Sequence, residues 1–229
     1  MVEAEFDAVA SDYTAQHARS IRLSGEDVGY FAHYKIADAR KIADRRNLTV
    51  QRIMDFGAGI GNSLQPMRAQ FPDAHIACLD VSDQSLDLCR SELSGGVDFR
   101  VYDGVQIPGD LGSFDLIFTA CVFHHIPATT HISLLSQIRD RLTPDGIFLL
   151  FEHNPWNPLT RHAVKNCPFD EHAVLISAPE MRRRLLAAGF RQVRIDYRVF
   201  FPGPLSALRI FEPALVRVPM GAQYSLTAC

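Results

Sequence analysis

The sequence predicts an α/β fold in which a doubly wound, seven-stranded, mostly parallel sheet carries helices on both faces. Two observations support this prediction. Short segments that are apolar along most of their length alternate with amphipathic segments of helical period. The chain of 229 residues is also 47% hydrophobic and 21% charged, which are values of a globular protein. Apolar strands separated by amphipathic helices imply a parallel sheet that is covered on both faces.

Seven segments have the composition of strands. They are residues 51–55, 75–80, 97–102, 114–120, 146–151, 190–200 and 222–228. The helices expected between them are residues 62–70, 82–93, 129–142 and 179–188. Ser82 is a suitable N-cap for the second of these helices, and Pro144 and Gly146 are expected to close the third. The last strand mixes polar and apolar residues, as a strand near a sheet edge does.

Composition and charge exclude several classes of protein. The net charge of −3 gives no general attraction to nucleic acid or to anionic membranes. The five cysteines are scattered without a C-x-x-C pair, which favours free thiols in a reducing compartment over disulfides or a zinc site. The acidic start lacks the pattern of a secretory signal, and no apolar run approaches membrane-spanning length. We therefore expect a cytoplasmic protein with no membrane span and no nucleic-acid partner.

Three glycines follow the first predicted strand in "RIMDFGAGIGNS", residues 52–63. In a doubly wound sheet, ligands bind outside the carboxyl ends of the strands, where the first strand-to-helix turn lies. A nucleotide-like ligand is therefore expected at this turn. The dinucleotide motif G-x-G-x-x-G would need a glycine where the chain has Asn62, and the phosphate-loop motif has no match.

The motif that does match is D-x-G-x-G-x-G, formed by Asp55, Gly57, Gly59 and Gly61. It resembles the first motif of the class I S-adenosylmethionine-dependent methyltransferases of the small-molecule type. The resemblance covers residues 50–152 specifically. It implies a Rossmann-like fold, S-adenosyl-L-methionine as cofactor and S-adenosyl-L-homocysteine as product.

Three further elements of that family have counterparts in the chain. In the family an acidic residue ends the second strand and binds both ribose hydroxyls, and Asp80 stands at that position. An acid after the third strand faces the adenine amino group, as Asp103 would, and "FDLIFTACVFHHI" is similar to the strand-four signature. The cofactor-binding residues implied are Tyr13, Asp55, Gly57, Ala58, Gly59, Gly61, Asn62, Asp80, Val81, Asp103, Gly104, Val105, Thr119 and Ala120.

The reaction that this family catalyses determines whether the site needs a general base. Methyl transfer from a sulfonium is an in-line displacement, and a general base is needed only when the nucleophile must lose a proton, as a hydroxyl does. His124, His125 and His153 follow the fourth and fifth predicted strands and are the candidate catalytic residues. For each of them the alternative is a packing role. Cys121 lacks the preceding proline of cytosine-C5 enzymes and is interpreted as a small buried residue.

The acceptor site is expected near aromatic and polar residues outside the core. Tyr30 and Tyr34 lie four residues apart, on one helical face, where they would either enclose the sulfonium or pack the helix. The substrate-binding candidates are Tyr30, Tyr34, Glu152, Asn154, Trp156 and Arg161. The lysine and two acids of metal-dependent catechol enzymes are not arranged recognisably, so no metal is expected.

These observations predict one domain over residues 1–229. It comprises an N-terminal helical lid (1–45), a cofactor-binding core (50–152) and two insertions that form the substrate pocket or a lid (153–178 and 201–221). The apolar residues of 201–221 would also suit a homodimer contact.

The predicted function is methyl transfer from S-adenosylmethionine to a small molecule, with a hydroxyl of a sugar or secondary metabolite as acceptor. Three alternatives stay open. They are N- or C-methylation of a small molecule, a cofactor-binding protein without catalysis, and an NAD-type oxidoreductase.

Overall fold

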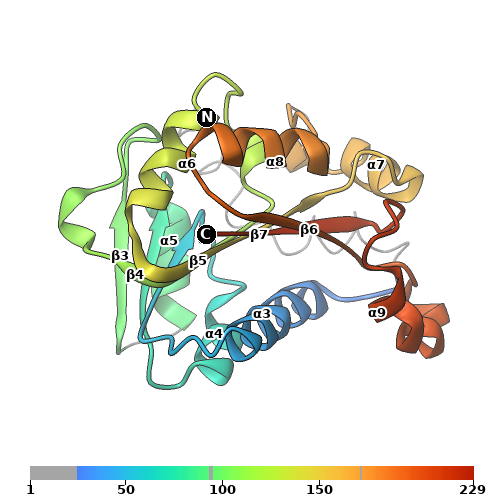
Figure 1. The fold of residues 1–229 in the computed structure, drawn as a ribbon, viewed down its shortest axis with the longest axis horizontal. Coiled ribbons are helices and arrows are strands. Elements are labelled where there is room, and N and C mark those ends of the chain that lie inside the picture. Colours follow the sequence, from blue (N-terminus) through green and yellow to red (C-terminus); the bar gives the residue numbers. More distant parts are fainter. Residues whose placement is uncertain (1–24, 93–94, 171) are drawn as a thin grey trace.

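The computed structural model describes residues 25–92, 95–170 and 172–229, and it contains one seven-stranded sheet (Figure 1). The strand order is β3-β2-β1-β4-β5-β7-β6. The strands are β1 (Arg52–Phe56), β2 (His75–Asp80), β3 (Val97–Val101), β4 (Phe114–Ala120), β5 (Leu142–His153), β6 (Val193–Arg198) and β7 (Gln223–Ala228). Strands β1 to β5 pair in parallel, and β7 is antiparallel to both β5 and β6. The predicted fold class is confirmed.

Helices cover both faces of the sheet. One face carries α3 (Val28–Arg45), α4 (Leu64–Gln70) and α5 (Asp83–Glu92), and the other carries α6 (His131–Asp140) and α8 (Ala178–Ala187). Figure 1 shows α6 and α8 above the sheet, with α3 and α4 below it. The remaining elements are η2 (Gly109–Leu111), η3 (Phe123–His125), α7 (Pro158–Lys165), η4 (Pro168–Asp170), η5 (Gly203–Phe211) and α9 (Glu212–Leu215).

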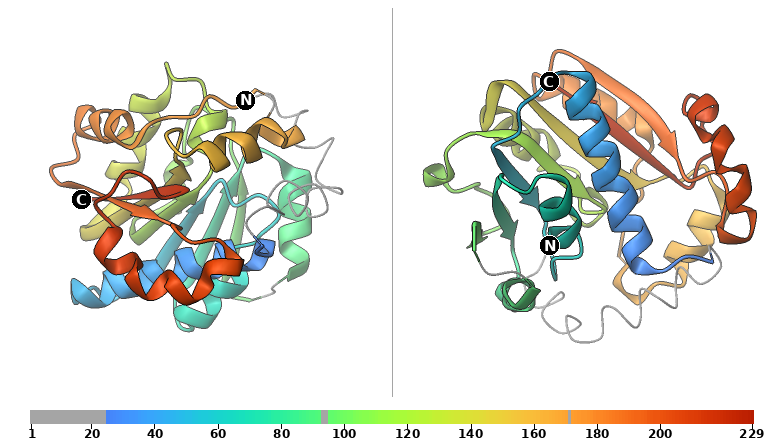
Figure 2. Two further views of the ribbon diagram at one scale, coloured as in Figure 1. Left: turned by 90° about the vertical axis from the view of Figure 1, so that its right-hand side faces the viewer. Right: turned by 90° about the horizontal axis from the view of Figure 1, so that it is seen from below.

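Helix α3 shows why residues 28–45 become helical. Asp27 caps its first turn, because the carboxylate accepts a hydrogen bond from the backbone N–H of Tyr30 at 2.7 Å. Its buried side chains recur at helical spacing and pack in the apolar core of that face. Figure 2 (right) shows α3 running across the sheet beside α4. The rest of the predicted lid, residues 1–24, lies outside the described residues.

The start of β5 differs from the prediction. The helix expected over 129–142 ends at Asp140, and strand β5 begins at Leu142, which pairs with Phe114. The register shifts between Phe114 and Leu116, so the strand enters the sheet through an irregularity. Pro144 is accommodated in this irregular stretch, since the regular pairing resumes only at Ile147. Pro144 therefore lies inside a strand and does not close the preceding helix.

Residues 201–221 form η5 and α9 at one end of the sheet. Several of their apolar side chains are exposed, with Ile210 at 76% and Met220 at 69%. The segment is attached through Glu212, whose carboxylate accepts hydrogen bonds from the backbone N–H groups of Phe200 and Phe201. A lid or homodimer role for it stays a prediction. Within the part of the chain that the structure describes, no helix has both the length and the hydropathy needed to cross a membrane.

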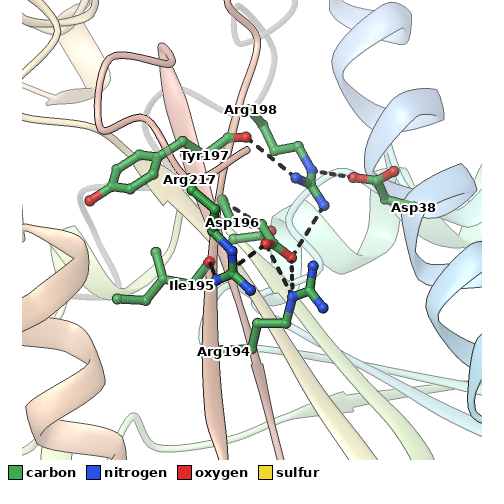
Figure 3. Close-up of polar contacts among 8 residues, drawn as sticks. Asp38, Arg194, Ile195, Asp196, Tyr197, Arg198 and Arg217 are labelled. Atoms are coloured by element: carbon green, nitrogen blue, oxygen red, sulfur yellow. Dashed lines mark hydrogen bonds and ion pairs between the residues drawn. The ribbon is translucent and has the colours of Figure 1, made fainter. Parts of the chain in front are cut away.

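A buried carboxylate fastens the outer strand β6. Asp196 is 3% exposed and lies near three arginines, at 2.9 Å from Arg194, 3.7 Å from Arg198 and 3.7 Å from Arg217 (Figure 3). Arg198 also forms an ion pair with Asp38 of α3. This network therefore connects the edge of the sheet to the helix that covers it.

We expect Asp196→Asn to lower the free energy of unfolding by about 2 kcal/mol, because charged hydrogen bonds to a buried carboxylate are lost. Urea unfolding followed by circular dichroism measures this difference. Asp110→Asn is the matched control, since Asp110 is 69% exposed and pairs with Arg100 only at 3.8 Å. It should change stability by less than about 0.5 kcal/mol. Equal stability of the two variants would contradict the assigned role of Asp196.

Candidate functional site

The glycine loop lies between β1 and α4, and its conformation requires glycine at three positions. Gly57, Gly59 and Gly61 have φ of +76°, +54° and +89°. A Cβ on Gly57 would stand 2.4 Å from Cγ2 of Val122, and one on Gly61 would stand 2.6 Å from Sγ of Cys89. A Cβ on Gly59 would meet no heavy atom of the described residues within 4 Å. The loop is therefore packed at its two ends and open at its centre.

Asp80 stands at the end of β2 beside this opening. Its Oδ2 accepts a hydrogen bond from the backbone N–H of Gly59 at 2.8 Å, and its Oδ1 accepts one from Ser82 at 3.0 Å. The carboxylate is buried, so its position is fixed relative to the loop. Asp80 therefore holds the loop in position. It is also the predicted ligand of the ribose.

Asp103 lies at the end of β3 and is exposed. Its Oδ1 accepts backbone hydrogen bonds from Val105 at 2.8 Å and Gln106 at 2.7 Å. The backbone N–H groups of Gln106 and Val105 lower the pKa of this carboxyl, so the group stays ionised and shapes the turn. A contact with adenine stays a prediction.

The other predicted cofactor residues lie at the carboxyl ends of the first four strands. Ala58, Val81 and Thr119 are buried, and the Thr119 hydroxyl donates to the carbonyl of Phe56 at 2.7 Å. A Cβ on Gly104 would stand 3.6 Å from Val81, so the turns after β2 and β3 are in contact. Ala120 is half-buried, Asn62 and Val105 are exposed, and Tyr13 lies outside the described residues.

Asp55 of β1 and Lys35 of α3 are two buried ionisable groups that interact with each other. Asp55 is 2% exposed, and its Oδ2 has no hydrogen-bond partner within the described residues. Burial and the charge of Asp80 raise the pKa of Asp55 to about 7, although Lys35 opposes both. Lys35 is 6% exposed, with Nζ 3.7 Å from Sγ of Cys121. An unpartnered buried carboxylate oxygen near an open glycine loop fits a ligand with a cationic group, such as the ammonium of an amino acid.

His124 has protein partners at both ring nitrogens. Its Nδ1 lies 2.6 Å from Oε2 of Glu152, and its Nε2 lies 3.3 Å from Oδ1 of Asp170. The other oxygen of Glu152 accepts a hydrogen bond from the backbone N–H of Phe123 at 2.8 Å. Burial lowers the pKa of His124, but Glu152 and Asp170 together outweigh burial and hold that pKa well above its ordinary value. His124 is therefore held between two carboxylates.

His125 shares Asp170 with His124. Its Nε2 lies 3.4 Å from the same oxygen, Oδ1 of Asp170. Burial, followed by the charge of His124, lowers the pKa of His125 to about 4. Burial raises the pKa of Asp170, but its hydrogen bond with His124 and the neighbouring histidines bring that pKa down to about 2. The side chains of His125 and Asp170 are 14% and 12% exposed, so this pair borders the surface.

His153 ends β5 on the α3 side and forms a hydrogen bond with Cys121. Burial raises the pKa of the Cys121 thiol, but His153 and Lys35 outweigh it and lower that pKa to about 7. Burial lowers the pKa of His153, whereas Cys121 raises it above its ordinary value. The backbone of Cys121 has φ +60°, an uncommon value for a residue with a side chain. Cys121, His153 and Lys35 thus form one polar cluster.

The two predicted aromatic residues of α3 face this region. Tyr34 donates a hydrogen bond to Gln223 of β7, which pairs with His153, and its ring lies 6.2 Å from that of Phe151. Tyr30 packs against Tyr34 and carries Arg209 over its ring at 4.6 Å. Contact of either tyrosine with an acceptor stays a prediction.

The predicted substrate residues after β5 divide into two kinds. Glu152 binds His124, and the amide of Asn154 binds the carbonyls of Pro219 and Gly221 at 3.1 and 2.8 Å. These two side chains therefore support the site and hold the adjacent loop. Trp156 is 53% exposed and its ring stacks on that of Tyr197, while Arg161 is exposed on α7.

The prediction from sequence gave no site role to Lys35 and interpreted Cys121 only as a small buried residue. Lys35 occupies the apolar stripe of α3, together with Ala32, Ile36 and Ala39, and a lysine on such a stripe is a signal that could have been recognised. Cys121 carries no comparable signal, because its neighbours Lys35 and His153 come from distant parts of the chain.

Comparison with known proteins identifies the core of the chain. A sequence profile described as "Methyltransferase domain" matches residues 54–148. The chain is 35% identical over 135 residues to a trans-aconitate 2-methyltransferase of Methylobacterium nodulans, a match that covers 57% of this chain and 51% of the relative. It is 28% identical over 154 residues to a malonyl-[acyl-carrier protein] O-methyltransferase of Geobacter sulfurreducens, covering 63% and 57%. The chain thus spans about half the length of these curated relatives.

A solved structure has the same fold over nearly the whole chain. It is described as a SAM-dependent methyltransferase, possible histamine N-methyltransferase, from Thermotoga maritima. The TM-score is 0.68 at 16% identity, and the match covers 98% of this chain and 97% of the other. Strands β6 and β7, which follow the five parallel strands, therefore belong to the fold that the two chains share.

The raised pKa of Asp55 predicts that the free energy of unfolding depends on pH. Since its folded pKa of about 7 exceeds the unfolded value of about 3.9, Asp55 favours folding when protonated, and this contribution is lost as pH rises from about 4 to about 7. Asp55→Asn lacks the titration. We expect the unfolding free energy of this variant, relative to the native chain, to increase by about 2–3 kcal/mol between pH 5 and pH 8. Urea titrations at both pH values measure it, and a constant difference would contradict the raised pKa.

Proposed function

Because this chain belongs to the class I S-adenosylmethionine-dependent methyltransferases, we propose that it transfers a methyl group to a hydroxyl oxygen of a small molecule. The observation that carries the proposal is the open glycine loop flanked by two buried carboxylates, Asp55 and Asp80. S-adenosylmethionine, when bound, supplies a methyl group on a positively charged sulfur that is already electrophilic. The task of the protein is then to orient the acceptor and to accept its proton.

Three residues would hold the cofactor. Gly59 leaves the room that a nucleoside and its chain need against the backbone. Asp80 lies beside that room and would accept hydrogen bonds from ribose hydroxyls. Oδ2 of Asp55 has no hydrogen-bond partner in the described part of the chain, and an ammonium group would satisfy it.

His153 is the proton acceptor that the geometry favours. Both nitrogens of His124 face carboxylates, and His125 faces Asp170. His153 instead lies on the α3 side, beside Cys121 and near the buried cation of Lys35. His153 can accept the acceptor's proton in its neutral form, when Cys121 keeps its own proton, and the imidazolium that forms would lie beside the sulfur of Cys121.

A carboxylate acceptor is the second candidate, and the names of the two curated relatives favour it. A carboxylate is already ionised and needs no base, and the buried ammonium of Lys35 would attract it. The two acceptor classes therefore differ in their dependence on His153. In either case the net charge of −3 suits a small molecule better than nucleic acid.

We expect Gly59→Val to abolish binding of S-adenosylhomocysteine, because the side chain would fill the open centre of the loop. Isothermal titration calorimetry measures the affinity. Gly95→Val is the matched control, since Gly95 also has a positive φ, +102°, and open space around its Cβ, but lies before β3. The control should bind normally. Normal binding by Gly59→Val, or stabilisation of the native chain by NADH and not by S-adenosylhomocysteine in thermal unfolding, would exclude the proposal.

We expect His153→Ala to lower kcat for a hydroxyl acceptor by about 10²–10⁴-fold while leaving the affinity for S-adenosylhomocysteine nearly unchanged. A packing role would instead lower the melting temperature, and the rate would follow the folded fraction. Turnover of a panel of hydroxyl and carboxylate acceptors measures the effect, with His162→Ala, an exposed position on α7, as control. Loss confined to hydroxyl acceptors identifies the base, whereas retained turnover on every hydroxyl acceptor removes His153 from that role.

A further inference from the structure

Two histidines and an aspartate converge at one point at the carboxyl end of β4. One potential ligand atom from each of His124, His125 and Asp170 lies within 4.8 Å of the other two. The histidines belong to η3 and the aspartate to η4, so the cluster forms only when the segment after β5 folds back over β4. Nothing in the proposed methyl transfer uses this convergence.

The spacing of these atoms suits ligands of one metal ion. A tetrahedral site with metal–ligand bonds of about 2.0–2.1 Å places its ligand atoms roughly 3.3–3.5 Å apart. Asp170 Oδ1 lies 3.3 Å from Nε2 of His124 and 3.4 Å from Nε2 of His125. Both distances exceed the 2.7–2.9 Å of a charge-assisted hydrogen bond. A single carboxylate oxygen that faces two imidazole nitrogens at this spacing resembles two edges of a coordination tetrahedron.

The surroundings of His124 provide a second, independent indication. Metal-binding histidines commonly donate their other ring N–H to a carboxylate, which fixes the tautomer and aims the remaining lone pair at the ion. Oε2 of Glu152 lies 2.6 Å from Nδ1 of His124, and Oε1 of the same carboxylate is held by the backbone N–H of Phe123. This arrangement directs Nε2 of His124 toward Asp170.

We propose that His124, His125 and Asp170 bind a divalent transition-metal ion with at least one open coordination position. Two imidazole nitrogens and one carboxylate suit Zn²⁺, Co²⁺ or Fe²⁺ and disfavour Mg²⁺ and Ca²⁺, which prefer oxygen ligands. The ion would reach the site from the side of His125 and Asp170, which retain some exposure, whereas His124 is buried.

This proposal departs from the metal-free site that the sequence predicts. That prediction rested on the scattered cysteines and on the lack of the lysine and two acids of catechol enzymes. The ligands here are separated by 45 residues of sequence (170 minus 125) and come together through η4. The proposal does not depend on methyl transfer, and it is tested with metal alone.

The test is metal binding by the full chain after removal of bound metal with a chelator. We expect one equivalent of Zn²⁺ or Co²⁺ by calorimetry and by elemental analysis after dialysis. His125→Ala and Asp170→Asn should each weaken binding at least 100-fold, and Glu152→Gln should weaken it about 10–100-fold. His75→Ala is the matched control, because His75 pairs with Asp98 at 3.6 Å on the surface, and it should bind normally.

Co²⁺ provides a spectroscopic check, since a four-coordinate site absorbs visible light much more strongly than a six-coordinate site. Absence of a stoichiometric site in the native chain would overturn the proposal. So would unchanged affinity in His125→Ala and Asp170→Asn, because the ion would then bind elsewhere. Circular dichroism establishes that each variant is folded. If one variant unfolds, the other decides, since the two residues lie on separate segments.

Discussion

Parallel pairing of β1 with β2 and β4 brings the carboxyl ends of three strands to one edge of the sheet, and the chemistry of the chain depends on that edge. The glycine loop follows β1 and is held on one side by Asp80 at the end of β2. On the other side Gly57 packs against Val122, beyond the end of β4. A side chain on Gly57 would push against Val122, and one on Gly61 would push against Cys89 of α5. The open centre at Gly59 is therefore a consequence of tight packing around it.

The end of β5 divides the edge into two polar clusters. Successive side chains of a strand point to opposite faces, so Glu152 and His153 separate. Glu152 joins His124 on one side, and His153 joins Cys121 on the α3 side. The rings of His124 and His153 nevertheless lie only 5.3 Å apart. One adjacent pair of residues therefore serves two groups of ionisable side chains, and a substitution at either position acts on the electrostatics of both.

The fold and the position of the glycine loop could be predicted from the sequence because the patterns that indicate them are local. The glycine spacing, the apolar strands and the acids at strand ends all lie within short windows, and the structure places them at one edge. The polar clusters could not be predicted in this way. Cys121 contacts Lys35 and His153, and His124 contacts Asp170, and each contact joins distant segments. The prediction that Pro144 closes a helix was also wrong, because the register shift of β5 accommodates the proline inside the strand.

Burial of Asp55 is the reason why a cationic ligand would be favoured at the proposed site. The carboxyl is surrounded by apolar strands and helices, and its Oδ2 finds no donor within the described residues. Such a group is costly to ionise, so near neutral pH it is only partly charged in the free chain. A bound ammonium would lower its pKa and recover interaction energy that folding alone does not provide. Lys35 supplies part of that compensation from α3, and its burial is possible for the same reason, because opposite charges stabilise each other more strongly where water is excluded. A bound cationic ligand would therefore recover the part of this stability that Lys35 does not supply in the free chain.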